Sequence, residues 1–393
     1  MPRIFHQLGF RYQWNIDSFS NDSVGEGFVL SPVNIEKSKL LNIFSDSIRT
    51  LSILDPQYYL IGDAKANLAS YDYFPAVISA GADTQEFQTI SKESALKCIN
   101  YQNEIGVKYF TIPARYYEVW PPNYLHSFKK EIFDNFLKST ASTDPDKKVI
   151  CTLIVKDYQL KTPERFDEVL TWATSLRGIN GFYLIFENNS TSKQIKDIDF
   201  LFNALRFIKY LKLNDYEVII GYCNNEGLLY SLAEVDVVTV GIYENLRSFD
   251  IKRFTTVENS KIHGPNPRIY SSRLNQWIDY NYLAALKNLY GEYSSLFDDS
   301  PYKPEMFVPD YNWHFQKKEP YLHYFCSYSA QIASLPMNIS DRIGFVKQKL
   351  LDSIALFNDI ADSGVRLDDN SDGSHLNSWL NVIPMYEKFL RDV

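Results

Sequence analysis

Apolar runs alternate with segments of helical spacing between residues 147 and 247. The runs at 148–157, 181–189, 217–225 and 235–245 are rich in β-branched residues and predict strands. The segments 163–176 and 197–213 repeat apolar residues every three or four positions and predict helices. Strands that are apolar on both faces and alternate with helices indicate a parallel sheet covered by helices.

The pattern extends in both directions and predicts four further strands, at 27–32, 51–56, 107–114 and 268–272. Helices are expected at 36–48, 91–104 and 122–138, and a last one runs from 273 to the glycine at 291. Eight strands, most of them followed by a helix, predict a (β/α)8 barrel over residues 1–291. The alternative is an open doubly wound sheet, but its glycine-rich phosphate motifs GxGxxG and GxxxxGK[ST] are absent from the sequence.

Two insertions interrupt this regular spacing, near 60–90 and 246–266, and both leave the face where the strands end. Residues 292–393 form a mainly helical C-terminal extension. Its segment 340–360 has a single apolar stripe, and a last helix carries Trp379 and Tyr386. The extension either packs on the barrel or docks a protein partner, and the sequence leaves both open.

Composition narrows the range of functions. The net charge of −8 over 393 residues argues against a broad nucleic-acid-binding surface, although a local basic groove stays possible. Aromatic residues make up 15% of the chain, which fits core packing or a stacking surface for sugars or bases. The N-terminus lacks an apolar signal core and no 18-residue apolar run occurs, so we expect a cytoplasmic protein without membrane contact.

Carboxylates follow several predicted strands. In a barrel the residues just past each strand converge on one mouth, and paired carboxylates there can divide acid and base roles because their pKa values move apart. The catalytic candidates are Asp55, Asp157, Glu187 and Glu244. The placement of Asp157 and Glu244 after the fourth and seventh predicted strands resembles that of barrel glycosidases, although the Asn-Glu pair of that group is missing. Each carboxylate is otherwise an exposed loop charge or a salt-bridge partner.

Other polar side chains at the same ends are candidates for binding a substrate. They are Arg115, Tyr116, Tyr222, Asn224, Asn245 and Arg247. The six histidines share no HxH or HExxH spacing, so the sequence predicts neither a metal site nor a cofactor.

The segment 217–249 resembles the late strands of tRNA-guanine transglycosylases. Gly221, the helix near 226–233, the strand from Asp236 and the run from Asn245 to Arg247 carry the resemblance. It implies a barrel with base-exchange ancestry. The position of the family's nucleophilic aspartate holds Thr239, and the cysteine-rich zinc site has no counterpart. The resemblance therefore implies altered chemistry or an inert descendant.

Two functional hypotheses follow. The first is an enzyme that acts on an N- or O-glycosidic bond of a nucleoside or sugar substrate, because its oxocarbenium-like transition state needs carboxylates around the anomeric carbon. The second is a non-catalytic barrel that serves as a scaffold or recognition subunit, with a partner on the C-terminal helices. Nucleic-acid recognition by a local groove is a less favoured third reading.

Overall fold

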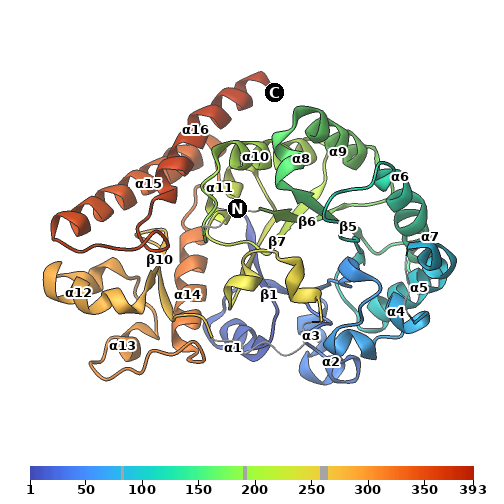
Figure 1. Cartoon of the computed structure of the whole chain (residues 1–393), viewed down its shortest axis with the longest axis horizontal. Coiled ribbons are helices and arrows are strands. Elements are labelled where there is room, and N and C mark those ends of the chain that lie inside the picture. The colour runs from blue at the N-terminus through green and yellow to red at the C-terminus, as the bar shows by residue number, and fades with distance from the viewer. Residues whose placement is uncertain (81–83, 189–192, 257–263) are drawn as a thin grey trace.

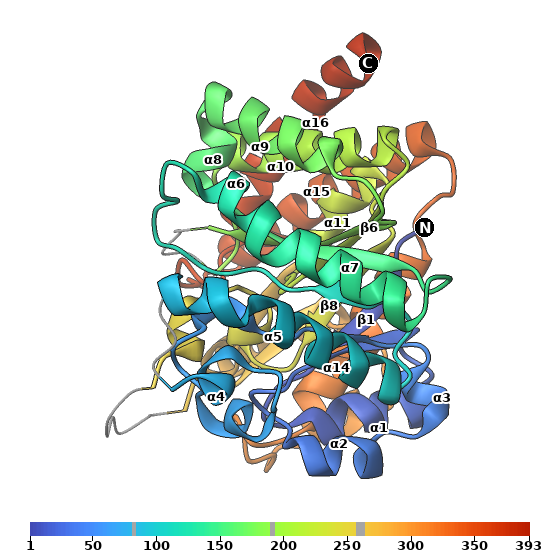
Figure 2. The ribbon, with the colours of Figure 1, turned by 90° about the vertical axis from the view of Figure 1, so that its right-hand side faces the viewer.

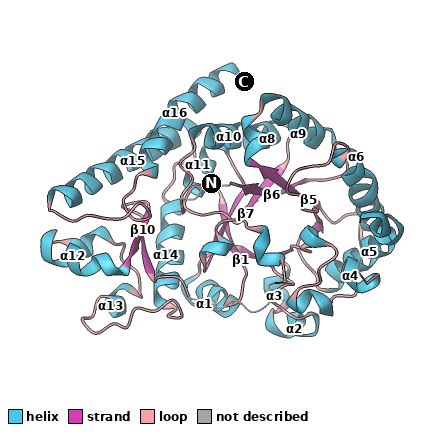
Figure 3. Ribbon diagram, viewed as in Figure 1, coloured by secondary structure: helices cyan, strands magenta, loops and turns pink. Residues whose placement is uncertain are grey.

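Eight parallel strands form a nearly closed barrel in the computed structural model, which describes residues 1–80, 84–188, 193–256 and 264–393. The strand order is β3-β2-β1-β8-β7-β6-β5-β4, and helices surround the strands (Figures 1 and 3). The predicted (β/α)8 fold is therefore confirmed. The strands are β1 (Arg3–Gln7), β2 (Gly27–Leu30), β3 (Ile53–Leu54), β4 (Phe110–Ile112), β5 (Val149–Lys156), β6 (Gly181–Glu187), β7 (Glu217–Gly221) and β8 (Val237–Gly241).

The barrel closes where β3 meets β4. The backbone N–H of Lys108 donates to the carbonyl of Ser52 at 2.8 Å, and the N–H of Tyr116 donates to the carbonyl of Tyr59 at 2.9 Å. One bond lies before the strands β3 and β4 and the other lies after them, so the two strands are joined without regular β pairing between them. All eight strand ends therefore face one mouth, as the sequence predicts.

Helices cover the outside of the barrel, and α5 and α7 lie side by side on its surface (Figure 2). The helix α14 packs against α1 and places Phe325 edge-on to His6 of β1, with ring centroids 5.0 Å apart. The helices on the barrel are α1 (Tyr12–Asp22), α2 (Lys37–Ile43), α3 (Asp46–Arg49), α4 (Pro75–Ile78), α5 (Thr84–Glu104), α6 (Tyr124–Phe128), α7 (Asp134–Thr143), α8 (Asp157–Lys161), α9 (Pro163–Ser175), α10 (Ile198–Leu213), α11 (Gly227–Tyr230) and α14 (Glu319–Ala333).

The strand β1 is a barrel strand that the sequence analysis missed. Its residues His6 and Gln7 are polar although they are fully buried, so the sequence does not show this strand as an apolar run. Both side chains bond to distant segments: the ring of His6 hydrogen-bonds the Val24 carbonyl at 2.9 Å, and the amide oxygen of Gln7 accepts from the Tyr183 hydroxyl at 2.9 Å. The amide nitrogen of Gln7 has no partner among the described residues. Only tertiary contacts make this polar strand stable inside the barrel.

The prediction of a barrel strand at 268–272 was wrong. This segment forms β9 (Arg268–Ser271), which pairs antiparallel with β10 (Gln276–Asp279) in a separate two-stranded sheet. The turn between them ends at Asn275, whose φ of 49° is left-handed. The helix expected from 273 therefore starts later, as α12 (Leu283–Leu289). The count of eight was right because one strand was missed and one was added.

Residues around this small sheet form a second apolar core. Ile269 and Ile278 pack there against Leu286, Phe297 and Ile360. The elements that complete this part of the chain are α13 (Lys303–Met306), α15 (Ile339–Asp362) and α16 (His375–Asp392). The two helices predicted near 340–360 and 379–389 are confirmed, whereas the division of the chain at 291 stays a prediction.

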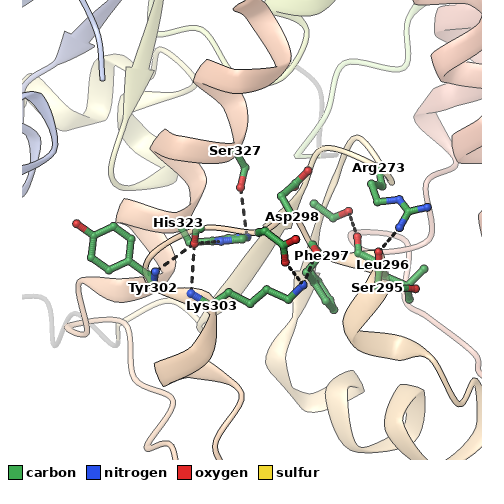
Figure 4. A network of polar contacts seen from close by, with 12 residues as sticks. Arg273, Ser295, Leu296, Phe297, Asp298, Tyr302, Lys303, His323 and Ser327 are labelled. Atoms are coloured by element: carbon green, nitrogen blue, oxygen red, sulfur yellow. Dashed lines mark hydrogen bonds and ion pairs between the residues drawn. The ribbon is translucent and has the colours of Figure 1, made fainter. Parts of the chain in front are cut away.

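A polar network holds the segment 295–303 against α14 (Figure 4). The Nδ1 atom of His323 lies 2.7 Å from the hydroxyl of Ser300, and its Nε2 atom lies 3.0 Å from the carbonyl of Tyr270. The ammonium of Lys303 donates to the carbonyl of Phe297 at 2.8 Å. Since His323 is fully buried, burial lowers its pKa and keeps it neutral.

Among the described residues, no helix combines the length and apolar character that crossing a bilayer requires.

Candidate functional site

Asp55 lies at the end of β3 in the centre of the barrel mouth and is 1% exposed. Its carboxylate accepts from the hydroxyl of Tyr59 at 2.7 Å and from the backbone N–H of Gln57 at 3.0 Å. Burial raises the pKa of Asp55 to about 6, although these hydrogen bonds and the charge of Arg253 oppose the shift.

Aromatic side chains cover this carboxyl group. Phe249 and Phe254, from the segment after β8 that includes η5 (Glu244–Leu246) and η6 (Ile251–Phe254), lie 5.1 and 4.7 Å from the ring of Tyr59. Phe249 also packs on Tyr222, 5.3 Å away. Both phenylalanines are almost completely buried. Among the described residues, these rings and Tyr59 pack around Asp55, whose carboxyl group is almost unexposed.

Glu187, at the end of β6, is neutralised by a neighbour. It is paired in register with Lys156 of β5, whose ammonium lies 2.8 Å from the carboxylate. The other carboxylate oxygen accepts from the hydroxyl of Tyr116 at 2.8 Å, and the ammonium also lies 3.9 Å from the centre of that ring. These contacts favour a structural role for Glu187 and Tyr116.

Three further predicted residues lie away from the mouth centre. Asp157 starts α8 and pairs with Lys161 at 2.8 Å, four residues later on the same helix. The guanidinium of Arg115 lies over the rings of Phe87 and Tyr117, at 5.3 and 5.0 Å. Asn245 is exposed after β8.

The remaining predicted residues meet in a crevice beside the mouth. Two adjoining cavities of about 30 and 100 Å³ share Lys193, Arg247 and Ser248 in their walls. We call this space the β7–β8 crevice. It is also lined by Tyr222, Cys223, Asn224, Glu226, Glu244, Arg268 and Trp277, among others.

Glu226 is the most perturbed carboxyl group of the crevice. It lies at the start of α11, is 5% exposed, and accepts from the backbone N–H of Asn224 at 3.3 Å. Its second oxygen is buried and has no hydrogen-bond partner among the described residues. Burial raises the pKa of Glu226 to about 7, against the backbone N–H groups and the charge of Arg247. Glu226 is therefore largely protonated below neutral pH and can donate a proton.

Glu244 has the opposite perturbation. Burial raises the pKa of its carboxyl group, but the charges of Lys193, Arg247 and Arg268 and a hydrogen bond from Lys193 outweigh this and lower the pKa below the ordinary value. Glu244 is therefore ionised at neutral pH. Glu226 lines the smaller of the two adjoining cavities and Glu244 the larger. The crevice that the two cavities form is thus bordered by one raised and one lowered carboxyl pKa, the pattern that separates acid and base roles.

Arg247 forms the back wall of the crevice. Its guanidinium stacks on Trp277 of β10 at 3.9 Å and donates to the carbonyl of Ile242 at 3.0 Å. Several buried polar atoms here have no hydrogen-bond partner among the described residues: Oδ1 of Asn224, Nε of Arg247, Nε1 of Trp277 and the hydroxyl of Tyr324. Buried polar atoms usually have a partner, so a polar ligand or water would satisfy these four atoms.

The crevice contains Tyr222, Asn224, Glu244 and Arg247 from the predicted set. Sequence reasoning missed Glu226, which was assigned to a helix although it follows directly on the strand-end run from Tyr222 to Asn225. It also missed Lys193, Arg268 and Trp277. No local signal marks these three, because they reach the crevice from the β6–α10 connection and from the second sheet.

The structure offers no evident metal site: among the described residues, no three His, Cys, Asp or Glu side chains group together. Thr239, which the resemblance aligned with the transglycosylase nucleophile, is fully buried and accepts from the backbone N–H of Cys223 at 3.2 Å. Comparisons with protein-family models, with curated proteins and with solved structures found no match. The resemblance to tRNA-guanine transglycosylases has no support from them.

Proposed function

We propose that the chain is an enzyme that acts on a glycosidic bond at the β7–β8 crevice, with Glu226 as general acid and Glu244 as the ionised carboxylate. The opposite pKa perturbations of these two groups around one crevice carry the proposal. Cleavage of a glycosidic bond needs this combination, because one group protonates the leaving atom while the other faces positive charge at the anomeric carbon.

The other crevice residues have binding roles in this proposal. The unpartnered amide oxygen of Asn224 would accept from a sugar hydroxyl, and the Nε–H of Arg247 would donate to one. Lys193 holds Glu244 in its ionised state and would move aside when a substrate competes for the carboxylate. The cavities are smaller than a sugar ring requires, so Ser248 and Lys193, both accessible to solvent, would shift on binding.

The test is a screen of nucleosides and 4-nitrophenyl glycosides against the wild-type protein, Glu226→Gln and Glu244→Gln. Loss of one catalytic carboxyl should lower kcat by roughly 100-fold or more. Glu168→Gln is the matched control, since Glu168 is exposed on α9 and pairs only with Arg165 at the surface. Turnover that survives both crevice substitutions would contradict the proposal.

The pH profile provides a second test. Activity should fall as the pH rises above about 7, where Glu226 loses its proton. In Glu226→Asp the descending limb should move, whereas in Glu168→Gln it should stay in place. A profile that rises through pH 8 would exclude Glu226 as the acid.

A second candidate function is recognition without catalysis. Lysines neutralise Asp157, Glu187 and Glu244, and aromatic rings fill the centre of the mouth. Such a barrel would bind a ligand without changing it. No turnover in the screen, together with sugar or nucleoside binding that Glu226→Gln leaves unchanged, would favour this function.

The C-terminal helices can be tested separately as a partner site. Deleting residues 340–393 would remove Leu350 and Trp379, which are fully buried, and would expose the core. Replacing the exposed Phe345 and Leu351 of α15 with aspartate leaves the core in place. If α15 binds a protein partner, these substitutions should abolish the complex without lowering Tm.

A further inference from the structure

The larger cavity of the β7–β8 crevice, of about 100 Å³, has an excess of positive charge. Its walls include Lys193, Arg247 and Arg268, and the only acidic side chain among the described residues that line it is Glu244. Lys193 forms an ion pair with Glu244, so these two charges compensate each other. The charges of the two arginines are left without compensation.

Both arginines are buried, since Arg247 is 4% exposed and Arg268 is 8% exposed. Their hydrogen bonds go to neutral acceptors: Arg247 donates to the carbonyl of Ile242 at 3.0 Å, and Arg268 donates to the carbonyl of Asn370 at 3.0 Å. Among the described residues, no carboxylate lies within ion-pair distance of either guanidinium. Burial lowers the pKa of Arg247, and the charge of Arg268 adds to this shift.

The acid that could compensate Arg268 has other partners. Asp279 is opposite Arg268 in the pairing of β9 with β10. The carboxylate of Asp279 accepts instead from the backbone and side-chain N–H groups of Asn281, at 3.0 and 2.9 Å. The charge of Arg268 therefore remains directed to the cavity that it lines.

Stacking on aromatic rings does not neutralise Arg247. Its guanidinium lies 3.9 Å from the ring centre of Trp277 and 5.4 Å from that of Tyr324, contacts that stabilise a cation but leave its charge. Nε of Arg247 and Nε1 of Trp277 are also buried donors without a partner among the described residues. Buried charges in proteins are almost always paired, so an anion in this cavity would supply the pairing that the chain itself does not.

We infer that the larger cavity binds a phosphate monoester, so that the substrate of the proposed reaction is a phosphorylated sugar or a nucleoside phosphate. The inference rests on the proposed function for the identity of the substrate, whereas the anion site itself needs no catalysis. A phosphate monoester has a charge of about −1.5 to −2 at pH 7, which matches two uncompensated arginines better than the single charge of a carboxylate. Guanidinium groups also bind phosphate oxygens through two parallel N–H donors.

A phosphate in this cavity agrees with the roles of the two carboxyl groups. Glu244 borders the same cavity and would lie beside the sugar that carries the phosphate. Glu226 lines the smaller cavity, which is left to the leaving atom that Glu226 protonates. The phosphate would also attract Lys193 and so release Glu244 toward the anomeric carbon.

Binding of inorganic phosphate, measured by calorimetry at pH 7 and constant ionic strength, tests the site directly. The Kd should rise roughly tenfold in Arg268→Gln, which loses a charge-assisted contact, and less in Arg268→Lys, which keeps the charge. Lys193→Gln, at a partly exposed position, should weaken binding in the same way as Arg268→Gln. Arg165→Gln is the matched control and should leave the Kd unchanged, since Arg165 is exposed on α9.

Two results of this experiment would overturn the inference. The first is that phosphate does not bind to the wild-type protein, or binds equally well to Arg268→Gln and Lys193→Gln. The second is that acetate binds as tightly as phosphate, because a site with two uncompensated cations should prefer the group with the larger charge.

Activity provides an independent test, in which nucleosides are compared with their 5′-monophosphates and 4-nitrophenyl glycosides with their 6-phosphates. In the wild-type protein, kcat/KM should be roughly 100-fold higher for the phosphorylated form, from contacts with two arginines, and Arg268→Gln should reduce this ratio roughly tenfold. Phosphate binding that depends on Arg268, without turnover of any glycoside, would support the anion site and refute the glycosidic function. Turnover with equal kcat/KM for the two forms would keep the glycosidic function and overturn the inference.

Discussion

Replacing Glu226 with glutamine should remove a defined pH dependence from the stability of the protein. The carboxyl group is buried, and its pKa is about 7 in the folded chain against an ordinary value of 4.5. A group whose pKa is raised by folding stabilises the folded state while it is protonated, and this contribution is lost as the pH rises through the folded pKa. Glutamine stays neutral, so Glu226→Gln lacks this dependence.

The size of the effect follows from the two pKa values. At pH 5 the protonated carboxyl group contributes about 3 kcal/mol to the free energy of unfolding, and at pH 8 it contributes almost nothing. The free energy of unfolding of Glu226→Gln, minus that of the wild-type protein, should therefore increase by about 2–3 kcal/mol from pH 5 to pH 8.

Urea denaturation at several pH values between 5 and 8 measures this difference. The control Glu168→Gln removes an exposed carboxylate and should differ from the wild-type protein by less than about 0.5 kcal/mol, without a trend. A difference for Glu226→Gln that stays constant, or that decreases with pH, would show that Glu226 is ionised at neutral pH. The assignment of Glu226 as general acid would then fail with it.

Three other outcomes can be measured by the same denaturation assay. Lys156→Met should destabilise the fold by about 3–5 kcal/mol because it leaves the buried Glu187 unpaired, and adding Glu187→Gln should restore most of the loss. Phe249→Ala should lower the free energy of unfolding by about 3–5 kcal/mol. A loss below about 1 kcal/mol would mean that the aromatic rings around Tyr59 are loosely packed. Burial lowers the pKa of His6 to about 4, so the neutral ring stabilises the fold above pH 6.5 and this contribution is lost as the pH falls. Relative to His6→Asn, the free energy of unfolding of the wild-type protein should fall by about 2 kcal/mol from pH 7 to pH 5.

Much of the architecture was predictable because it depends on local patterns. The strands β5 to β8 are continuous apolar runs and pair in parallel, as burial on both faces predicts. The helices α10, α15 and α16 show their apolar stripes directly in the sequence. The same reasoning identified the mouth as the place where polar strand ends gather, including Glu244 and Arg247.

The site itself was predictable only in part. Strand position alone made Asp157, Glu187 and Glu244 equal candidates. Only the structure shows that Asp157 pairs with Lys161 on α8 and that Glu187 pairs with Lys156 of the neighbouring strand. Glu244 also has a lysine partner, but it differs because it borders the larger cavity of the crevice.

The sequence by itself determined the class of fold, since an alternating pattern of apolar runs and amphipathic segments can bury its surface only as a sheet covered by helices. Tertiary structure alone decided the rest. The polar strand β1 is stable only because Val24 and Tyr183 supply its hydrogen bonds from other segments. The raised pKa of Glu226 exists because burial removes water from a carboxyl group, and the stacking of Arg247 on Trp277 joins residues thirty positions apart. Burial and pairing are properties of three-dimensional neighbours, which the order of residues along the chain does not specify.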